Sequence, residues 1–301
     1  MAKPKVIVIV GPTASGKTSA SIQLAKLMDG EIISADSMQI YQEMNIGTAK
    51  PTPEEMDGVP HYLIDFVSPE ENYNVTLYKK EAEKAIREIL AKGKVPIIVG
   101  GTGLYVSTLI NGIEFSEVEE DKTYREEMMK IAADKGNEYL HDMLARVDKA
   151  AAEKIDVNNV RRIIRALEIY HVTGRTKTEL DEESKQEVMY DYFVYGIETP
   201  REELYERINQ RVDQMLQAGL VEEVKNLMLH HEISKTALQG LGYKEVIEYL
   251  NGKASYDEMV SKVKMESRRY AKRQLTWFRR EKKIKWCSLD TIVSVIINDF
   301  T

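Results

Sequence analysis

The feature that most constrains the fold of this chain is an apolar run that leads directly into a glycine-rich loop near the N-terminus. Lys5–Val10 reads KVIVIV, a continuous β-branched run that predicts a strand buried on both faces of a parallel sheet. Gly11–Thr18 then reads GPTASGKT and matches the pattern G-x-x-x-x-G-K-[ST] between a strand and a predicted helix at Ser19–Met28. The chain is therefore expected to begin with a strand, a phosphate-binding loop and a helix.

Each residue type in this loop has a physical role in holding a phosphate chain. The glycines permit the tight turn, and backbone N–H groups at the start of the helix face phosphate oxygens. Lys17 adds positive charge, and the Thr18 hydroxyl can ligate Mg²⁺. The expected diphosphate-binding residues are Gly11, Thr13, Ala14, Ser15, Gly16, Lys17 and Thr18. The loop predicts that a diphosphate or triphosphate binds, and it leaves the reaction open.

Other motifs of nucleotide-hydrolysing proteins are missing from the sequence. The N-K-x-D motif that reads the base in GTPases is absent. An ATPase motor carries an apolar strand that ends in Asp, whereas the run Val95–Val99 leads into Gly100-Gly101-Thr102-Gly103. This turn either lets the backbone approach a ligand beside the phosphate loop or is a plain glycine turn.

Strand-like and helix-like patterns alternate along most of the chain. Further strands are expected at Glu31–Ser34, His61–Ile64, Val95–Val99, Asp191–Ile197 and Ile284–Cys287. One helix is expected to open with Thr199 as its N-cap and Pro200 at its first position and to run to about Gln217, and another to cover Tyr256–Lys283. The alternation predicts an α/β fold, a doubly wound parallel sheet with helices on both faces.

A different composition interrupts this alternation in the middle of the chain. From about Asp121 to Arg175 no β-branched run occurs, and Ala, Glu, Lys, Met and Leu dominate. We interpret this part as an all-helical insertion. The expected domains are a catalytic core at residues 1–113 and 190–301, which includes a basic C-terminal helix, and a helical insertion at residues 114–189.

Asp36 follows the predicted strand Glu31–Ser34 and is expected near the carboxyl edge of the sheet, where doubly wound folds bind ligands. A carboxylate there can take a proton from an attacking group or bind Mg²⁺ indirectly. An equal alternative is that Asp36 caps the next helix. Asp65, after Tyr62-Leu63-Ile64, is a weaker candidate of the same kind.

The overall composition limits the class of protein. Of 301 residues, 42 are Lys or Arg and 49 are Asp or Glu, which gives a net charge of −7. The single cysteine, Cys287, excludes an internal disulfide and fits a reducing compartment, so we expect a cytoplasmic protein. No stretch approaches the ~20 apolar residues of a membrane span, and the five histidines show no zinc-ligand spacing. Nothing in the sequence indicates an interface, so we expect a monomer.

The net charge hides a strong asymmetry near the C-terminus. Between Lys262 and Lys285 the chain has eleven basic and two acidic residues, so this segment carries +9 and the rest of the chain −16. On a helix, a packed stripe of Val260, Val263, Ser267, Tyr270, Gln274 and Trp277 leaves a second face with Arg269, Lys272, Arg273, Thr276 and Arg280. Such a face can follow a phosphate backbone, or it can be a solvated, salt-bridged surface.

A second basic cluster lies at the end of the helical insertion. Its members are Arg161, Arg162, Arg165 and Arg175, opposed only by Glu168. Taken alone, such a cluster is more often a solvated or salt-bridged surface. Two clusters, one in the insertion and one in the tail, favour a nucleic acid that is held by both.

Two further arginines lie one turn apart on the helix that follows Pro200. Arg207 and Arg211 can reach over the bound phosphates as a clamp. Surface salt bridges explain the pair equally well.

With these residues identified, the chain closely resembles the bacterial tRNA dimethylallyltransferases, also called tRNA isopentenyltransferases. The resemblance covers essentially the whole chain and rests on GPTASGKT at 11–18, DSMQIYQEMNIGTAKP at 36–51, GGTGLY at 100–105, RRIIRALEIYHVTGR at 161–175, LGYKE at 241–245 and KRQLTWFR at 272–279. It implies a P-loop-kinase-like parallel sheet with a helical insertion. It also implies transfer of the dimethylallyl group of dimethylallyl diphosphate to the exocyclic amine of the adenosine that follows the anticodon in certain tRNAs.

The resemblance further implies roles for the candidate residues. Lys17 and Thr18, the latter with Mg²⁺ as cofactor, would stabilise the pyrophosphate leaving group, and Arg211 would assist. Asp36 would act as the base toward the adenine amine, and Thr102 would help to position the adenosine. The implied tRNA-binding residues are Asp36, Ser37, Met38, Gln39, Thr102, Arg125, Arg161, Arg162, Arg165, Lys244, Lys272 and Arg273. The implied partners are dimethylallyl diphosphate and the anticodon stem-loop of tRNA.

Two other functions stay open from the sequence. ATP-dependent small-molecule kinases, such as nucleotide or shikimate kinases, share the same fold. An RNA-binding NTPase whose basic helices only bind RNA would also carry the phosphate loop. The three functions differ in whether dimethylallyl diphosphate is consumed or ATP is turned over.

Overall fold

The structure is a computed structural model that describes residues 3–114, 118–183 and 187–300. The chain divides into two compact units. The core unit consists of Met1–Ile110 and Val188–Thr301, and the insertion unit of Asn111–Glu187. Each unit has its own hydrophobic core, and each is described by itself below.

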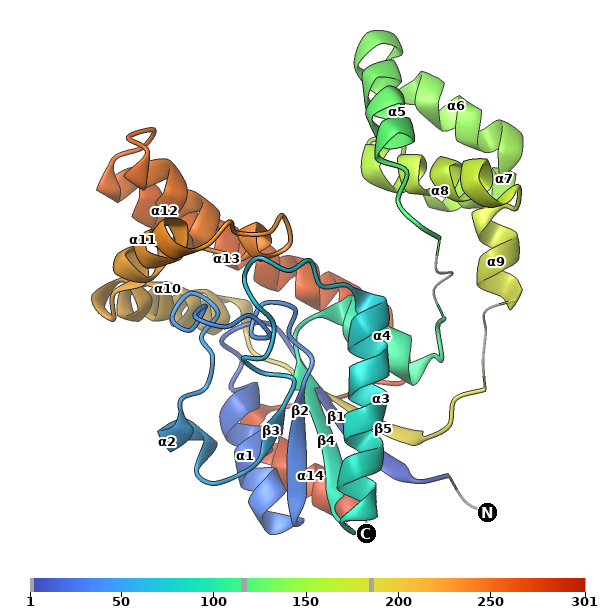
Figure 1. The fold of residues 1–301 in the computed structure, drawn as a ribbon. Coiled ribbons are helices and arrows are strands. Elements are labelled where there is room, and N and C mark those ends of the chain that lie inside the picture. The colour runs from blue at the N-terminus through green and yellow to red at the C-terminus, as the bar shows by residue number, and fades with distance from the viewer. Residues whose placement is uncertain (1–2, 115–117, 184–186, 301) are drawn as a thin grey trace. The chain divides into compact units, whose positions relative to one another are not determined.

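The core unit is built on one sheet of six parallel strands in the order β3-β2-β4-β1-β5-β6 (Figure 1). The strands are β1 (Lys5–Val10), β2 (Gly30–Ser34), β3 (His61–Tyr62), β4 (Val95–Gly100), β5 (Asp191–Ile197) and β6 (Lys285–Cys287). The expected α/β class with a parallel sheet is confirmed. Because β1 lies between β4 and β5, the loop that follows it is flanked by the carboxyl ends of both neighbours, which is where such sheets bind ligands.

Strand β1 is buried on both faces, as its continuous apolar run predicts. Val6, Val8 and Val10 pack with one cluster, which includes residues of α3 and α4. Ile7 and Ile9 pack with a second cluster, to which α1 and α14 contribute. Helices therefore cover both faces of the sheet (Figure 1).

The helices of the core unit alternate with the strands and then follow β5 in a long run. They are α1 (Lys17–Leu27), α2 (Pro53–Met56), α3 (Val75–Ala91), α4 (Gly103–Ile110), α10 (Arg201–Gln217), α11 (Leu220–His230), the short 3₁₀ helix η1 (Ala237–Gln239), α12 (Tyr243–Leu250), α13 (Tyr256–Phe278) and α14 (Leu289–Phe300). Helix α13 contacts both α10 and α12. Among the described residues, no helix has both the length and the apolar character needed to cross a membrane.

The insertion unit is helical throughout its described part. Its helices are α5 (Lys122–Lys135), α6 (Asn137–Val147), α7 (Lys149–Lys154), α8 (Val160–Thr173) and α9 (Lys177–Glu183). Their apolar faces meet in a core that contains Leu140, Leu144, Ile163 and Leu167. The spacing of four residues within each pair, on α6 and on α8, is typical of an amphipathic helix.

Several expected boundaries were wrong by one or two residues, as at α1, which begins at Lys17 instead of Ser19, and three differences are described here. The third strand ends at Tyr62 instead of Ile64, because Leu63 and Asp65 adopt positive φ angles of 60° and 59°, which no strand can contain. Helix α10 is preceded by Pro200 as its N-cap, so Thr199 lies outside it and gives no side-chain cap. Helix α13 ends at Phe278, where the backbone tightens into a turn through Glu281.

Candidate active site

A cavity of about 360 Å³ lies at the carboxyl edge of the sheet, entirely within the core unit. It brings together segments that are far apart in the sequence: the phosphate loop, the turn after β2, the loop at Gly47–Ala49 and the helices α10, α11 and α13. The expected site residues that line it are Thr13, Lys17, Thr18, Asp36, Ser37, Met38, Gln39, Arg211 and Arg273. One cavity therefore holds a phosphate-binding loop and a carboxylate.

The phosphate loop has the backbone that its sequence demands. Gly16 has a φ angle of 90° and directly precedes α1, whose first residue is Lys17, so the helix N-terminus faces the loop. The Lys17 ammonium donates to the Pro12 carbonyl at 2.7 Å. Burial lowers the pKa of Lys17 to about 8, an effect that Asp36 opposes and Arg211 increases. The loop thus presents a lysine whose charge a bound anion would stabilise.

Arg211 of α10 lies over the same loop. Its Nη1 is 3.5 Å from the Thr13 hydroxyl, and burial lowers the pKa of its guanidinium. Arg207, one turn earlier, pairs with Glu203 at 2.5 Å instead. The structure therefore separates the two arginines: Arg211 faces the cavity, and Arg207 forms the surface salt bridge.

Asp36 organises a turn and caps no helix. Its Oδ1 accepts hydrogen bonds from the backbone N–H of Met38 at 2.9 Å and of Gln39 at 3.4 Å. The Thr102 hydroxyl accepts the Ser37 N–H at 3.0 Å and so braces the same turn from the end of β4. One carboxylate oxygen of Asp36 is thus held by the backbone, and the half-buried side chain lines the cavity.

Asp65, the weaker candidate, is engaged elsewhere. It pairs with Lys50 at 2.5 Å, and Lys50 also donates to the Tyr41 carbonyl. Asp65 does not line the cavity. The strand that precedes it is a short edge strand, so its carboxyl end lies away from β1.

Helix α13 is fastened to the phosphate loop by a buried glutamine that the sequence did not single out as a site residue. The Gln274 side chain accepts the Thr13 N–H at 2.9 Å and donates to the Gly101 carbonyl at 2.9 Å. Tyr270, one turn earlier, also lines the cavity, and burial and then the Asp36 carboxylate raise the pKa of its hydroxyl. From the sequence, Tyr270 and Gln274 were both expected only as members of the packed stripe of this helix.

At the glycines after β4, the space that a side chain would need is taken up by protein atoms. A Cβ on Gly101 would lie 2.1 Å from the Gln274 amide, and one on Gly103 would lie 2.3 Å from the Trp277 ring. The Trp277 indole also donates to the Ser107 hydroxyl at 2.9 Å. These glycines are therefore needed because α13 packs directly on the turn.

The basic segment of α13 divides into two parts. Toward its start, Lys262, Lys264 and Arg269 form ion pairs with Glu248, Asp213 and Glu266, respectively, and Arg268 donates to Asn209. Toward its end, Lys272 and Arg273 are exposed and form no ion pair among the described residues, and Arg273 lies 5.6 Å from the Tyr270 ring centre. Lys244 at the start of α12 is exposed as well. In the later part, Lys272 and Arg273 are therefore exposed cations without an acidic partner among the described residues.

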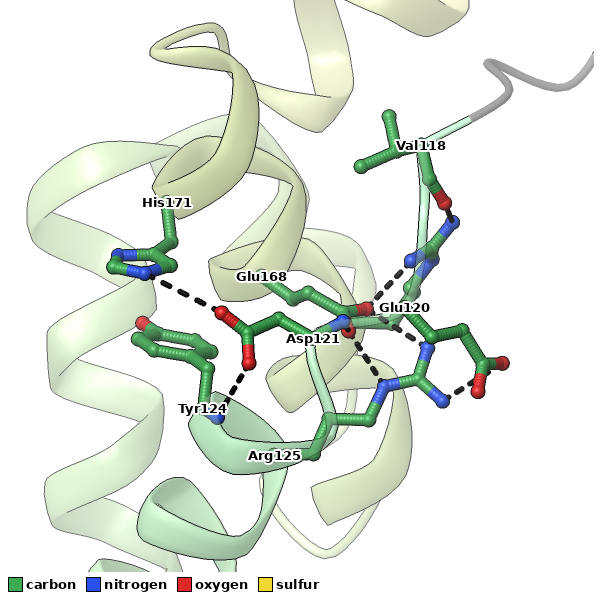
Figure 2. Close-up of polar contacts among 8 residues, drawn as sticks. Val118, Glu120, Asp121, Tyr124, Arg125, Glu168 and His171 are labelled. Carbon is green, nitrogen blue, oxygen red and sulfur yellow. Dashed lines mark hydrogen bonds and ion pairs between the residues drawn. The ribbon is translucent and has the colours of Figure 1, made fainter.

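In the insertion unit, a buried carboxylate gathers two of the arginines expected to bind RNA (Figure 2). Glu168 on α8 is fully buried, accepts two hydrogen bonds from Arg125 at 2.8 Å and one from Arg165 at 2.5 Å. It also accepts the Asp121 N–H at 2.8 Å. Burial alone would raise the pKa of Glu168, but these hydrogen bonds outweigh burial and hold the pKa below its usual range. Arg161 and Arg162, on the same helix, are exposed.

Replacing Glu168 by glutamine is expected to destabilise the insertion unit by about 3–5 kcal/mol, because two arginines then lose the carboxylate that compensates them. Faster hydrogen exchange in α8 of the full chain would measure this loss. The matched control is Glu120→Gln, which removes an exposed partner of Arg125 and should cost less than about 1 kcal/mol. Equal exchange rates in the two variants would show that the network does not stabilise the unit.

The residues of this site offer few protein ligands for a metal ion. Among the described residues, no group of three or more His, Cys, Asp or Glu side chains could hold a metal ion. Thr18 is exposed and, like Lys17, lines the cavity. This arrangement fits Mg²⁺, which commonly takes one or two protein ligands and completes its shell with water and substrate phosphates.

Comparison with known proteins identifies the family. The model of the IPP transferase family matches residues 39–281. A tRNA dimethylallyltransferase of Carboxydothermus hydrogenoformans is 49% identical over 98% of this chain and 97% of its own length. A tRNA dimethylallyltransferase of Acetivibrio thermocellus is 52% identical over 95% and 92%, respectively.

Solved structures agree with these relatives. The full-length tRNA isopentenylpyrophosphate transferase of Bacillus halodurans has a TM-score of 0.73 and 43% identity and covers 99% of this chain and 96% of its own. A eukaryotic dimethylallyltransferase described as acting on tRNA has a TM-score of 0.81 and 32% identity, over 99% of this chain and 79% of its own. The resemblance read from the motifs is therefore confirmed, and the chain belongs to the IPP transferase family.

Proposed function

We propose that this protein transfers the dimethylallyl group of dimethylallyl diphosphate to the exocyclic amine of the adenosine that follows the anticodon in tRNA, with release of pyrophosphate. The observation that carries this proposal is the composition of the cavity at the carboxyl edge of the sheet. Lys17 and Arg211 supply charge for a diphosphate, and Asp36 supplies a base. Apolar side chains, which a branched hydrocarbon requires, also line the cavity: Ile208, Val212, Met215, Leu220, Leu241 and Val263.

The phosphate loop stabilises the leaving group. As the bond between the allylic carbon and oxygen breaks, negative charge builds on the pyrophosphate. Lys17, Arg211 and the backbone N–H groups at the start of α1 face that charge from fixed positions. Mg²⁺ held by Thr18 and the diphosphate would supply further positive charge there. Since the electrophile is a carbon atom, the loop needs no water-activating residue.

Asp36 takes the proton from the nucleophile. An adenine amine is a weak nucleophile because its lone pair is delocalised into the ring. The new carbon–nitrogen bond forms as Asp36 accepts the amine proton. Thr102 holds the turn that carries Asp36, so the carboxylate is in place before the adenosine arrives. The adenosine must leave its stack to enter the cavity, as in other base-modifying enzymes.

The proposed tRNA-binding residues fall into two groups. Ser37, Met38, Gln39 and Thr102 belong to the Asp36 turn or brace it and would contact the target nucleotide. Arg161, Arg162, Lys244, Lys272 and Arg273 are exposed cations that can contact phosphates. Arg125 and Arg165 act indirectly, by holding the insertion helices through Glu168. We further propose that the protein acts as a monomer in the cytoplasm.

Incubation of the protein with dimethylallyl diphosphate and unmodified tRNA tests the reaction. The expected result is a modified adenosine, detected by mass spectrometry of the digested tRNA, and a stoichiometric release of pyrophosphate. ATP turnover without modification would instead identify a kinase or an RNA-binding NTPase. The relatives that this chain matches are named for the first of these activities.

Removing the free charge at the end of α13 should weaken tRNA binding. In the double variant Lys272→Gln/Arg273→Gln, the slope of log K against log salt concentration should fall by roughly 1–2, because each phosphate contact contributes about 0.7–0.9. The control is Lys262→Gln/Lys264→Gln, which removes two lysines of the same helix that are already paired with acids. Equal slopes in the two double variants would contradict this placement of the RNA.

A further inference from the structure

One wall of the cavity is formed by a loop without regular structure, and a distant carboxylate holds it. Gly47, Thr48 and Ala49 of this loop line the cavity. Oε2 of Glu223, on α11, accepts the backbone N–H of Asn45 at 2.9 Å and of Ile46 at 2.7 Å. Its Oε1 accepts the Gly47 N–H at 3.1 Å and the Tyr243 hydroxyl at 2.7 Å.

The Glu223 carboxylate lies at the point toward which three backbone N–H groups converge. Three successive N–H groups that converge on one point form an anion-binding nest, and a charged acceptor makes each bond stronger than a neutral one. Tyr243 closes the nest from α12: a Cβ on Gly47 would lie 2.5 Å from its ring. Burial and then Glu223 raise the pKa of the Tyr243 hydroxyl, so it stays protonated and donates to the carboxylate.

The same loop also holds the side chain of Gln39, a residue of the turn that carries Asp36. The Gln39 amide donates to the Thr48 carbonyl at 3.3 Å and to the Ala49 carbonyl at 3.1 Å. Its oxygen accepts the Ser34 hydroxyl at 3.4 Å, which fixes the orientation of the amide. The Gln39 N–H also donates to Oδ1 of Asp36. A continuous series of hydrogen bonds therefore connects Glu223, through the loop and Gln39, to the proposed base.

We propose that Glu223 is a positioning residue for the transfer reaction: its carboxylate holds the turn at Asn45–Gly47, and through Gln39 this turn sets the position of Asp36. The inference rests on the proposed function, since the position of Asp36 matters only if Asp36 acts on a substrate. Glu223 does not itself line the cavity, and it contacts the lining only through the Gly47 N–H. Its loss should therefore affect the chemical step more than donor binding.

The test is the variant Glu223→Gln, which retains the shape of the side chain but replaces one acceptor oxygen with an NH₂ group. We expect kcat for tRNA modification to fall about 10–100-fold, since a displacement of about 1 Å at a reacting group can cost 100-fold. The Kd for inorganic pyrophosphate should change less than threefold, because the phosphate loop stays intact. The control is Glu222→Gln, which removes an exposed neighbouring carboxylate on the same helix and should retain the activity of the unmodified chain.

A double-mutant cycle with Gln39→Ala distinguishes positioning from general stability. If Glu223 acts through Gln39, the double variant should be no slower than the slower single variant. Independent, multiplying losses would overturn the proposal, as would a kcat within twofold of the unmodified chain. Parallel losses of kcat and pyrophosphate affinity would show a structural role only and would also overturn it.

Tyr243→Phe keeps the proposal testable if Glu223→Gln fails to fold. This variant removes one donor to Glu223 and retains the ring that packs on Gly47. It should lower kcat less than Glu223→Gln, with pyrophosphate affinity unchanged, and an unchanged kcat would count against the proposal. Absence of transfer by the unmodified chain would instead refute the proposed function itself, so the two failures are distinguishable.

Discussion

Replacing Asp36 by asparagine should lower the rate of tRNA modification by about 10²–10⁴-fold while leaving tRNA affinity largely intact. Asparagine retains an Oδ1 that can accept the Met38 and Gln39 N–H groups, so the turn should keep its shape. It cannot take a proton from the adenine amine. Single-turnover kinetics at saturating donor and tRNA measure the chemical step, and a filter-binding assay measures the affinity.

Asp36→Ala completes this experiment, because alanine removes both the base and the turn acceptor. If only the alanine variant is slow, Asp36 acts by holding the turn and not as the base. A loss of tRNA affinity that matches the loss of rate would identify a binding residue. The control is Asp57→Asn, at an exposed aspartate that pairs with Lys26 at the end of α2.

Replacing Lys17 by methionine should lower kcat/KM for the donor by about 10²–10³-fold, the usual loss when one group that stabilises developing charge is removed. Methionine fills a similar volume and carries no charge. The control is Lys26→Met on the same helix, where the lysine is largely exposed and pairs with Asp57. A variant at Lys17 that binds and transfers normally would show that the loop does not hold the diphosphate.

The pH dependence of the same parameter gives an independent test of Lys17. Burial lowers its pKa in the free protein to about 8, so the ammonium is charged below that pH and neutral above it. Because kcat/KM reports the free enzyme, its value should fall as the pH rises through about 8. The Lys17→Met variant should lack this alkaline limb. A limb that persists in the variant would belong to another group.

The regular elements followed from local patterns, and the errors fell where tertiary contacts set the backbone. β1 and β5 were predicted to the residue, since β-branched and aromatic side chains dominate both. The third strand was predicted too long because HYLI reads as a strand, although Leu63 adopts a positive φ angle. Such a conformation in a leucine requires surrounding structure to impose it.

In the candidate site, too, the residues with local sequence signals could be predicted, and those whose role depends on distant partners could not. The phosphate loop, Asp36 and Arg211 could be proposed from the sequence because their motifs or spacing are local. Gln274 could be assigned only to a packed stripe, since its partners Thr13 and Gly101 are far away in the sequence. Glu223 carried no signal beyond its place on a helix, because Asn45, which it binds, lies 178 residues away.

Charge counting predicted where RNA could bind but could not say which charges are free. Arg165 belongs to a cluster that Glu168 alone opposes in the sequence, and the family resemblance implied Arg125 as a further tRNA contact. That carboxylate, Glu168, is fully buried and binds both of them. On α13, the early lysines are paired and Lys272 is not. The distribution of charge along the chain is a property of the sequence, whereas pairing depends on which helices meet.

The sequence by itself determined the parallel sheet, the phosphate loop, the helical insertion and membership of the IPP transferase family, because contiguous residues encode each of these features. Only the tertiary structure decided that the loop, Asp36 and an apolar lining share one cavity, and which helices support it. The physical reason is that hydrogen bonds and ion pairs form between groups a few ångströms apart. That proximity is set by packing over the whole core unit.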